Sequence, residues 1–113
     1  MKLSDFDAWA RTLLDIDSLA GVDDSLNGVQ VGRSDGDIER VAFAVDASFE
    51  TIRRAAELGA QLLFVHHGLF WGKPLRVEGF LRDRIKLLLD SDIALYACHL
   101  PLDRHPEVGN NAV

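Results

Sequence analysis

The chain has 113 residues, of which 48% are hydrophobic and 27% are charged, and its formal net charge is −6. This length and composition are typical of one globular domain with a core of its own. The acidic balance argues against a general binder of nucleic-acid backbones, which needs a surplus of Lys and Arg, but it leaves room for a nucleotide as a small substrate.

The sequence carries no sign of export or of membrane insertion. Cys98 is the single cysteine, so no internal disulfide can form and nothing suggests an oxidising compartment. The first residues include acidic side chains where a signal peptide would have an uninterrupted apolar segment. No stretch approaches the ~18 apolar residues of a membrane span. We therefore expect a soluble cytoplasmic protein.

The amino-terminal segment predicts an amphipathic helix, with Ser4 as its N-cap and Asp7 completing a capping box. Its apolar residues at helical spacing are Leu3, Phe6, Trp9, Ala10, Leu13 and Leu14. Residues 15–25 are expected to form a loop. Residues 26–32, "LNGVQVG", predict a short strand that follows an Asn-Gly turn.

The next segments alternate between apolar runs and helical patterns. The apolar run at 40–48 predicts the first strand, which stops at Asp46. Ser48 is the expected N-cap of a helix over 49–59 that ends at Gly59. A second buried strand covers 60–68. A helix follows, with its apolar side formed by Val77, Phe80, Leu81, Ile85, Leu88 and Leu89.

The third buried strand covers 92–100 and is closed by Pro101. The last segment, 101–113, is expected to be irregular, although "GNNA" at 109–112 is a possible helix start. The order of elements predicts a βαβαβ core in a layered α/β/α fold with a mostly parallel or mixed sheet. We expect residues 1–113 to form one α/β domain.

Polar side chains gather where the three predicted strands end. Asp46 ends the first, His66 and His67 end the second, and His99 ends the third, with Asp103 four residues later. Ligands of open α/β sheets bind beyond the carboxyl ends of the strands, so these groups should meet at one edge. Imidazole and carboxylate together suit Zn²⁺, Fe²⁺ or Mn²⁺, and two such ions ~3.5–4 Å apart can share a water.

The pair His66 and His67 favours a metal or catalytic role, whereas His105 beside Pro106 is expected to be an ordinary loop residue. His99 is open between a metal ligand, a hydrogen-bond donor that orients Asp103, and a satisfied core group. Asp46 and Ser48 also fit a turn residue and a helix cap.

Other groups have plainer expected roles. Cys98 is expected to be a small buried apolar residue, and it cannot pair with His99 as a nucleophile because neighbours on a strand face opposite sides. Phe70 and Trp71 are expected to pack against the domain or to line a subunit interface.

Five short motifs follow one another along the whole chain. They are "NGVQVG" (27–32), "VDAS" (45–48), "VHHGLFW" (65–71), "HLPLD" (99–103) and "GNNA" (109–112). Together they resemble the amino-terminal half of the GTP cyclohydrolase 1 type 2 family, also described as the Nif-three-like family of dinuclear metal proteins. The elements VHHG and HLPLD are the most specific.

The resemblance implies a three-layer α/β fold, a cytoplasmic toroidal homohexamer and two divalent metal ions per subunit, drawn from Zn, Fe, Mn, Co and Mg. By motif, the metal ligands are His66, His67 and Asp103, and His99 is a candidate catalytic proton shuttle. Family members carry a later His-x-x-x-Glu pair that this sequence lacks. The resemblance therefore predicts that the carboxyl-terminal half of the family fold is missing and that waters or another chain complete the site.

Two classes of function remain open from the sequence. The first is a metal-dependent hydrolase that acts on GTP or a related heterocycle. The second is a non-enzymatic metal-binding or regulatory oligomer, or an inactive truncated member.

Overall fold

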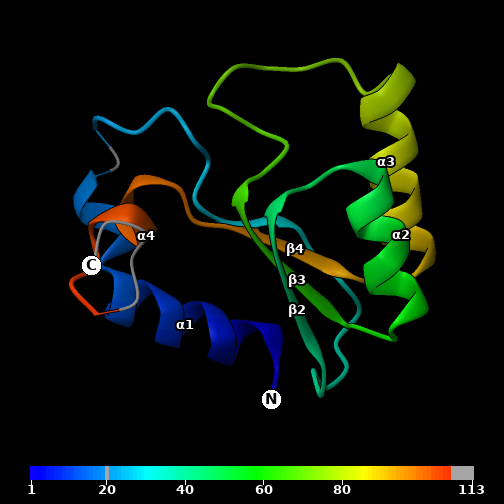
Figure 1. Cartoon of the computed structure of the whole chain (residues 1–113), viewed down its shortest axis with the longest axis horizontal. Coiled ribbons are helices and arrows are strands. Elements are labelled where there is room, and N and C mark those ends of the chain that lie inside the picture. The colour runs from blue at the N-terminus through cyan, green and yellow to red at the C-terminus, as the bar shows by residue number, and fades with distance from the viewer. Residues whose placement is uncertain (20, 108–113) are drawn as a thin grey trace.

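A computed structural model describes residues 1–19 and 21–107, and its strands form one mixed sheet in the order β1-β4-β3-β2 (Figure 1). The strands are β1 (Gly28–Val31), β2 (Val41–Asp46), β3 (Leu62–His67) and β4 (Ala94–Ala97). The motif at 109–112 lies outside the described residues.

Four α-helices and one short 3₁₀ helix complete the described fold. They are α1 (Leu3–Leu14), η1 (Ile16–Leu19), α2 (Phe49–Glu57), α3 (Gly79–Asp90) and α4 (Leu100–Arg104). Residues 15–25 were predicted to form a loop, but Ile16–Leu19 form η1. Residues 101–113 were predicted to be irregular, but the segment begins inside α4. Pro101 lies in the first turn of α4, where a missing N–H costs no helical hydrogen bond. None of the described helices has both the length and the apolarity needed to cross a membrane.

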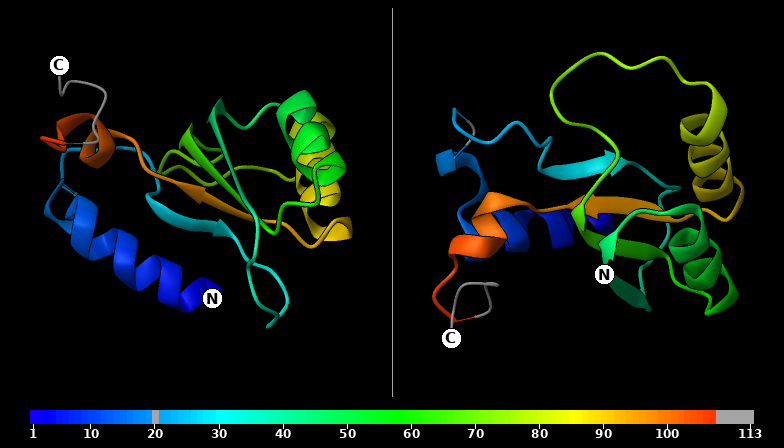
Figure 2. Two further views of the ribbon diagram at one scale, coloured as in Figure 1. Left: turned by 60° about the horizontal axis from the view of Figure 1, so that its bottom comes forward. Right: turned by 45° about the horizontal axis from the view of Figure 1, so that its top comes forward.

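The sheet lies between α1 on one face and α2 with α3 on the other, as Figure 2 shows. Alternation along β3 divides its side chains between two cores. Leu62 and Phe64 pack in the cluster that includes α1, whereas Leu63 and Val65 pack in the cluster that includes α2 and α3. The layered α/β/α fold predicted from the sequence is confirmed.

The pairing of strands confirms the predicted parallel core and adds one antiparallel edge. β2 pairs with β3 and β3 pairs with β4 in parallel, which is the βαβαβ unit. β1 pairs with β4 in the antiparallel sense, through Gly28 opposite Ala97. The sheet is therefore mixed, and β1 pairs with the strand farthest from it in the sequence.

The helix α2 begins and ends where the sequence predicts. The Ser48 hydroxyl accepts a hydrogen bond from the backbone N–H of Thr51 at 3.1 Å. Gly59 has a φ of 73°, the left-handed conformation that ends helices. Between these ends, Ile52 and Ala55 are buried against the sheet.

The prediction for the start of α1 was wrong. Lys2 is the N-cap, and its backbone N–H donates to the Asp5 carboxylate at 3.2 Å, so Ser4 lies inside the helix. Two residues of the predicted apolar face are also exposed: Trp9 is 58% exposed and Leu13 is 39% exposed. They border an apolar groove of about 540 Å³ between α1 and the edge strand β2, where Phe43 is 72% exposed.

The apolar side predicted for α3 is only partly buried. Leu88 is fully buried, and Leu81 and Ile85 pack against the same core. Phe80 at the start of the helix and Leu89 near its end are exposed, because the helix contacts the sheet along a narrower stripe than the sequence pattern suggests.

Candidate metal centre

The parallel pairing of β2, β3 and β4 brings the predicted polar side chains together at one edge of the sheet. Asp46 lies opposite His67 in the register of β2 and β3, and β4 leads directly into Cys98 and His99. The imidazole centroids of His66 and His67 lie 4.5 Å apart, and those of His66 and His99 lie 4.8 Å apart. One ring nitrogen from each of the three histidines falls within 4.8 Å of the others.

A different acceptor fixes the Nδ1 atom of each imidazole. His66 donates from Nδ1 to the backbone carbonyl of Cys98 at 3.0 Å, and His67 Nδ1 lies 2.7 Å from Asp46 Oδ1. His99 Nδ1 lies 3.1 Å from Asp23 Oδ1. Carbonyl and carboxylate oxygens accept only, so Nδ1 carries a proton in each ring, and in the neutral imidazole the lone pair is then on Nε2. This is the arrangement in which histidines bind metals.

Asp103 lies beside the free nitrogen of His66. Its Oδ1 is 3.4 Å from His66 Nε2, and the carboxylate comes from the first turn of α4. A lone pair that faces a carboxylate oxygen is repulsive unless a proton or a cation lies between them. Two ligand atoms ~2.1 Å from a tetrahedral ion lie ~3.4 Å apart, so the observed spacing fits a shared divalent ion.

The carboxylate that orients His99 comes from Asp23, which sequence reasoning placed in a loop without a role. Its side chain is 1% exposed, and its oxygens accept from Ser25 N, Asn27 Nδ2 and Leu100 N at 2.9–3.0 Å. Burial opposes ionisation, but these hydrogen bonds and the one with His99 outweigh it and hold the Asp23 pKa below its usual value. Asp23 is therefore a buried, charged hydrogen-bond acceptor for His99.

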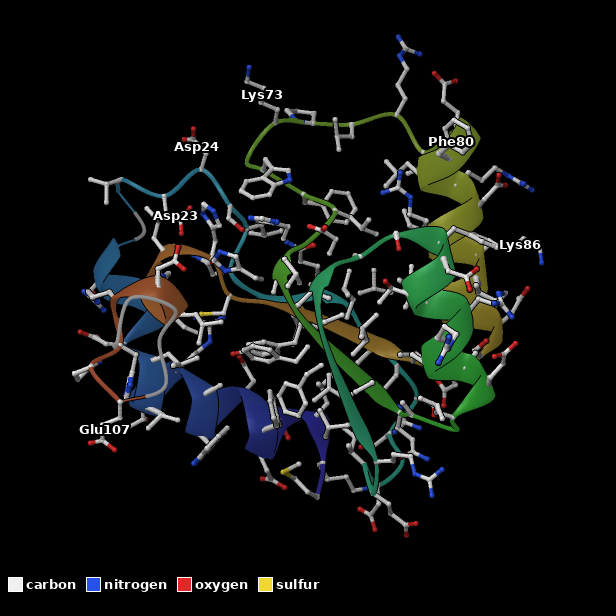
Figure 3. All side chains as sticks on the ribbon, viewed as in Figure 1. Asp23, Asp24, Lys73, Phe80, Lys86 and Glu107 are labelled. Carbon is white, nitrogen blue, oxygen red and sulfur yellow. The ribbon has the colours of Figure 1, made fainter. Side chains whose placement is uncertain are left out.

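No spacing rule could have connected Asp23 to the site, because 76 residues separate it from His99. The one local sign is the acidic pair Asp23–Asp24 before Asn27 and Gly28. Figure 3 shows that the neighbouring Asp24 points away from the molecule, whereas Asp23 points inward.

The turn after His67 is held in place by β1. Gln30 Oε1 accepts from the backbone N–H of Leu69 at 2.7 Å, and Gln30 Nε2 donates to the carbonyl of Leu26 at 2.7 Å. A Cβ at Gly68 would collide with the Gln30 amide, so a side chain at this position would displace Gln30 from the turn. The side chain of Phe70 packs against the core, as predicted.

Trp71 lies against the histidines, which the sequence did not predict. Its ring meets His99 edge-on with centroids 5.0 Å apart, and it lies 6.0 Å from His67. The indole therefore covers one side of the imidazole cluster.

Cys98 and His105, which were predicted to have no part in the site, lie outside the histidine cluster. Cys98 is fully buried, and burial raises the pKa of its thiol to about 12, so the thiol stays protonated. His105 is not in the histidine cluster, and its Nδ1 accepts from the backbone N–H of Glu107 at 3.1 Å.

Comparison with known proteins gives consistent similarities. Residues 1–113 match the family model Duf34/NIF3 (NGG1p interacting factor 3). The chain is 49% identical over 112 residues to the GTP cyclohydrolase 1 type 2 homolog of Treponema pallidum, covering 99% of this chain and 39% of the relative. It is 48% identical over 113 residues to the homolog of Archaeoglobus fulgidus, covering 100% of this chain and 45% of the relative.

Solved structures of similar proteins match the same fold. TTHA1606 from Thermus thermophilus matches with a TM-score of 0.93 and 42% identity, over 97% of this chain and 45% of that one. Reduced HcgD from Methanocaldococcus jannaschii matches with a TM-score of 0.80 and 33% identity, over 91% of this chain and 41% of that one. The chain thus spans less than half the length of these relatives.

Proposed function

Because the chain belongs to the Duf34/NIF3 family, we propose that it contributes to a divalent-metal-dependent hydrolase whose ions bind His66, His67 and Asp103. The observation that carries the proposal is the way in which the three clustered imidazoles are hydrogen-bonded. Each Nδ1 is held by an oxygen acceptor, which leaves the Nε2 atom of each neutral ring available to an ion, with the Asp103 carboxylate beside that of His66.

We extend this proposal to two ions per subunit, one near His66 and Asp103 and one near His67. Neutral imidazole and carboxylate ligands suit Zn²⁺, Fe²⁺, Mn²⁺ and Co²⁺, and Mg²⁺ would rely more on the carboxylates. The name shared by the relatives motivates GTP, or a related heterocycle, as the substrate of the proposed ring hydrolysis.

The residues have distinct roles in the proposed reaction. When bound, a divalent ion supplies a Lewis acid that polarises a substrate oxygen and lowers the pKa of a coordinated water. Asp103 offsets part of the positive charge at the site. His99 serves as a further ligand or as a proton shuttle, and Asp23 orients its ring. Trp71 excludes water from one side of the cluster.

One observation favours a second candidate, a metal-binding protein without catalysis. His66, His67 and His99 could hold one ion together, and Asp103 beside His66 would supply a fourth ligand to it. Structural zinc sites are closed in this way, whereas catalytic sites keep one position open.

Elemental analysis combined with a turnover assay separates these candidates. We expect the purified protein to retain divalent metal, and His66→Ala and His67→Ala to lose most of it, while His105→Ala serves as the matched control outside the cluster. Hydrolysis of GTP with added Mn²⁺, Zn²⁺ or Fe²⁺ that disappears in both variants supports the hydrolase. Retained metal with no turnover favours the second candidate, and unchanged metal content in both variants overturns the metal site.

We also propose a homohexamer in the cytoplasm. Light scattering on the purified protein tests this assembly, and a monomer at working concentration would contradict it.

A further inference from the structure

A cavity of about 420 Å³ lies beside the imidazole cluster and opens to solvent. Its lining includes Asp46, Phe49, His67, Trp71, Phe80 and Arg84. This volume lies within the range of pockets that bind small organic molecules. Two of its lining residues, His67 and Asp46, belong to the candidate metal centre, so an occupant of the cavity would lie next to a bound ion.

Arg84 is the cation that lines this cavity. It is half-buried on α3, and among residues 1–19 and 21–107 it has no carboxylate within ion-pair distance. Other cations of the same helix differ: Arg82 lies 3.9 Å from Asp83, and Lys86 pairs with Asp90. Arg84 therefore differs from Arg82 and Lys86 in that no carboxylate neutralises its charge, although the chain has a net charge of −6.

The charge of Asp46, the lining carboxylate, is already engaged. Its Oδ1 accepts from His67 Nδ1 at 2.7 Å, so this negative charge belongs to the histidine side of the cavity. Because Asp46 is held by His67, Arg84 is the lining side chain that can bind an anionic group of a ligand, and its guanidinium offers up to five N–H donors.

Aromatic rings line the space between these two charges. Phe49 comes from α2, Trp71 from the segment after β3, and Phe80 from α3, and all three are exposed, Phe80 at 81%. Figure 3 shows Phe80 at the start of α3, on the side of the loop that follows Trp71. Exposed aromatic faces around a cavity favour planar rings, which stack on them.

We propose that this cavity binds the organic part of the substrate: a planar ring that stacks on Phe49, Trp71 and Phe80, with an anionic group at Arg84. The anionic group is a phosphate or a carboxylate, since both match the planar guanidinium. The inference rests on the proposed function for its metal centre, and it adds a specificity residue, Arg84, that the metal ligands do not supply.

Calorimetric titration with three probes tests the proposal on the purified, metal-loaded protein. The probes are guanosine 5′-monophosphate, guanosine, which lacks the anion, and 2-naphthoate, which carries a carboxylate on a planar ring without a nucleoside. We expect Arg84→Gln to weaken the binding of both anions by ~10-fold or more and that of guanosine less than twofold. Arg82→Gln, two residues earlier on α3, is the matched control and should change nothing.

The variants also separate the possible sources of the anion. Loss confined to guanosine 5′-monophosphate identifies phosphate, and loss confined to 2-naphthoate identifies carboxylate. Phe80→Ala should weaken guanosine and its monophosphate alike, because it removes a stacking surface. Arg84→Lys keeps the charge and should retain part of the affinity, which excludes misfolding as the reason for the loss.

Three results would overturn the inference. They are equal affinity of Arg84→Gln and the unchanged protein for both anions, failure of the unchanged protein to bind any probe, and a shift in oligomeric state of Arg84→Gln or Phe80→Ala without a change in affinity. Metal analysis of the same samples keeps the two proposals distinct. Metal content should be normal in Arg84→Gln. If metal content is normal and Arg84→Gln binds the anions as tightly as the unchanged protein, the cavity proposal is contradicted and the metal centre is not. If the protein holds no metal but Arg84→Gln still weakens anion binding, the metal centre is contradicted and the cavity proposal is not.

Discussion

At the scale of single residues, the site depends on acceptors that hold the imidazoles as much as on the imidazoles themselves. His66, His67 and Asp103 could be named from the sequence because they stand at strand ends. Asp23 could not be, because its contact with His99 spans 76 residues and exists only in the folded chain. The role of Trp71 was also missed, since an aromatic residue after a strand has no pattern that separates core packing from contact with histidines.

Asp23→Asn should weaken metal binding by ~10–100-fold, because the loss of its charge weakens the hold on His99 Nδ1. The amide would also face the donors Leu100 N and Asn27 Nδ2, which should lower the free energy of unfolding by ~1–3 kcal/mol. A competition titration with a metal chelator and urea unfolding measure the two effects. Asp24→Asn, exposed and adjacent, is the matched control, and equal metal affinity of both variants would contradict the role of Asp23.

Cys98 should make stability fall in alkaline solution. Its pKa is about 12 in the folded protein and 9.0 as the ordinary value, so the folded state holds the proton more tightly. This contribution is fully present below pH 9 and is lost as the pH rises toward 12. Cys98→Ala should show a smaller loss of unfolding free energy over this window, measured by urea titration at several pH values. Equal slopes in both proteins would show that the thiol does not contribute.

At the scale of elements, local signals located the βαβαβ core correctly but not the contacts of its helices. Apolar runs and the Ser48 cap locate β2, α2 and β3 within a few residues. Burial of a helix face depends on what lies opposite it, and here the edge strand β2 leaves Trp9 of α1 exposed. The antiparallel pairing of β1 likewise depends on β4, which no neighbouring residue specifies.

Replacement by alanine should affect the free energy of unfolding differently at the two predicted helix caps, Ser48 and Ser4. Ser48→Ala removes the acceptor of Thr51 N and should lower the free energy of unfolding by ~0.5–2 kcal/mol. Ser4→Ala should be neutral or slightly stabilising, because Ser4 lies inside α1 and alanine is the better helix former. Urea unfolding of both variants measures the difference. Destabilisation by Ser4→Ala equal to that by Ser48→Ala would restore Ser4 as the cap.

At the scale of the whole molecule, the metal centre is assembled from segments far apart along the chain. Asp23 and Asp46 come from the first half, and His66, His99 and Asp103 come from the second. The family resemblance seen in the short motifs was confirmed by the family model, which matches residues 1–113. The three-dimensional arrangement that holds them could not be read from any one motif.

Metal binding should therefore stabilise the fold as a whole. An ion that binds the folded chain alone at 100 times its Kd adds ~2.7 kcal/mol to the free energy of unfolding. Thermal unfolding with added Zn²⁺ or Mn²⁺ should show a higher Tm than unfolding in a chelator, and His66→Ala should abolish the difference. A Tm that does not respond to metal would mean that the ion does not bind the folded centre selectively.

The contact between α1 and β4 has a consequence for the order of events during synthesis. Phe6 packs edge-on against Tyr96, and the Tyr96 hydroxyl donates to Asp7 at 2.7 Å, so the helix rests on a strand 89 residues later. At ~5–20 residues per second, the ribosome needs ~4–18 s to make the chain between them. Late in that interval α1 can pack against Phe64 of β3, but it lacks Tyr96, and the centre still lacks His99 and Asp103. Completion of the contact between the first helix and the sheet and completion of the metal centre are thus late and nearly simultaneous steps in the synthesis of the chain.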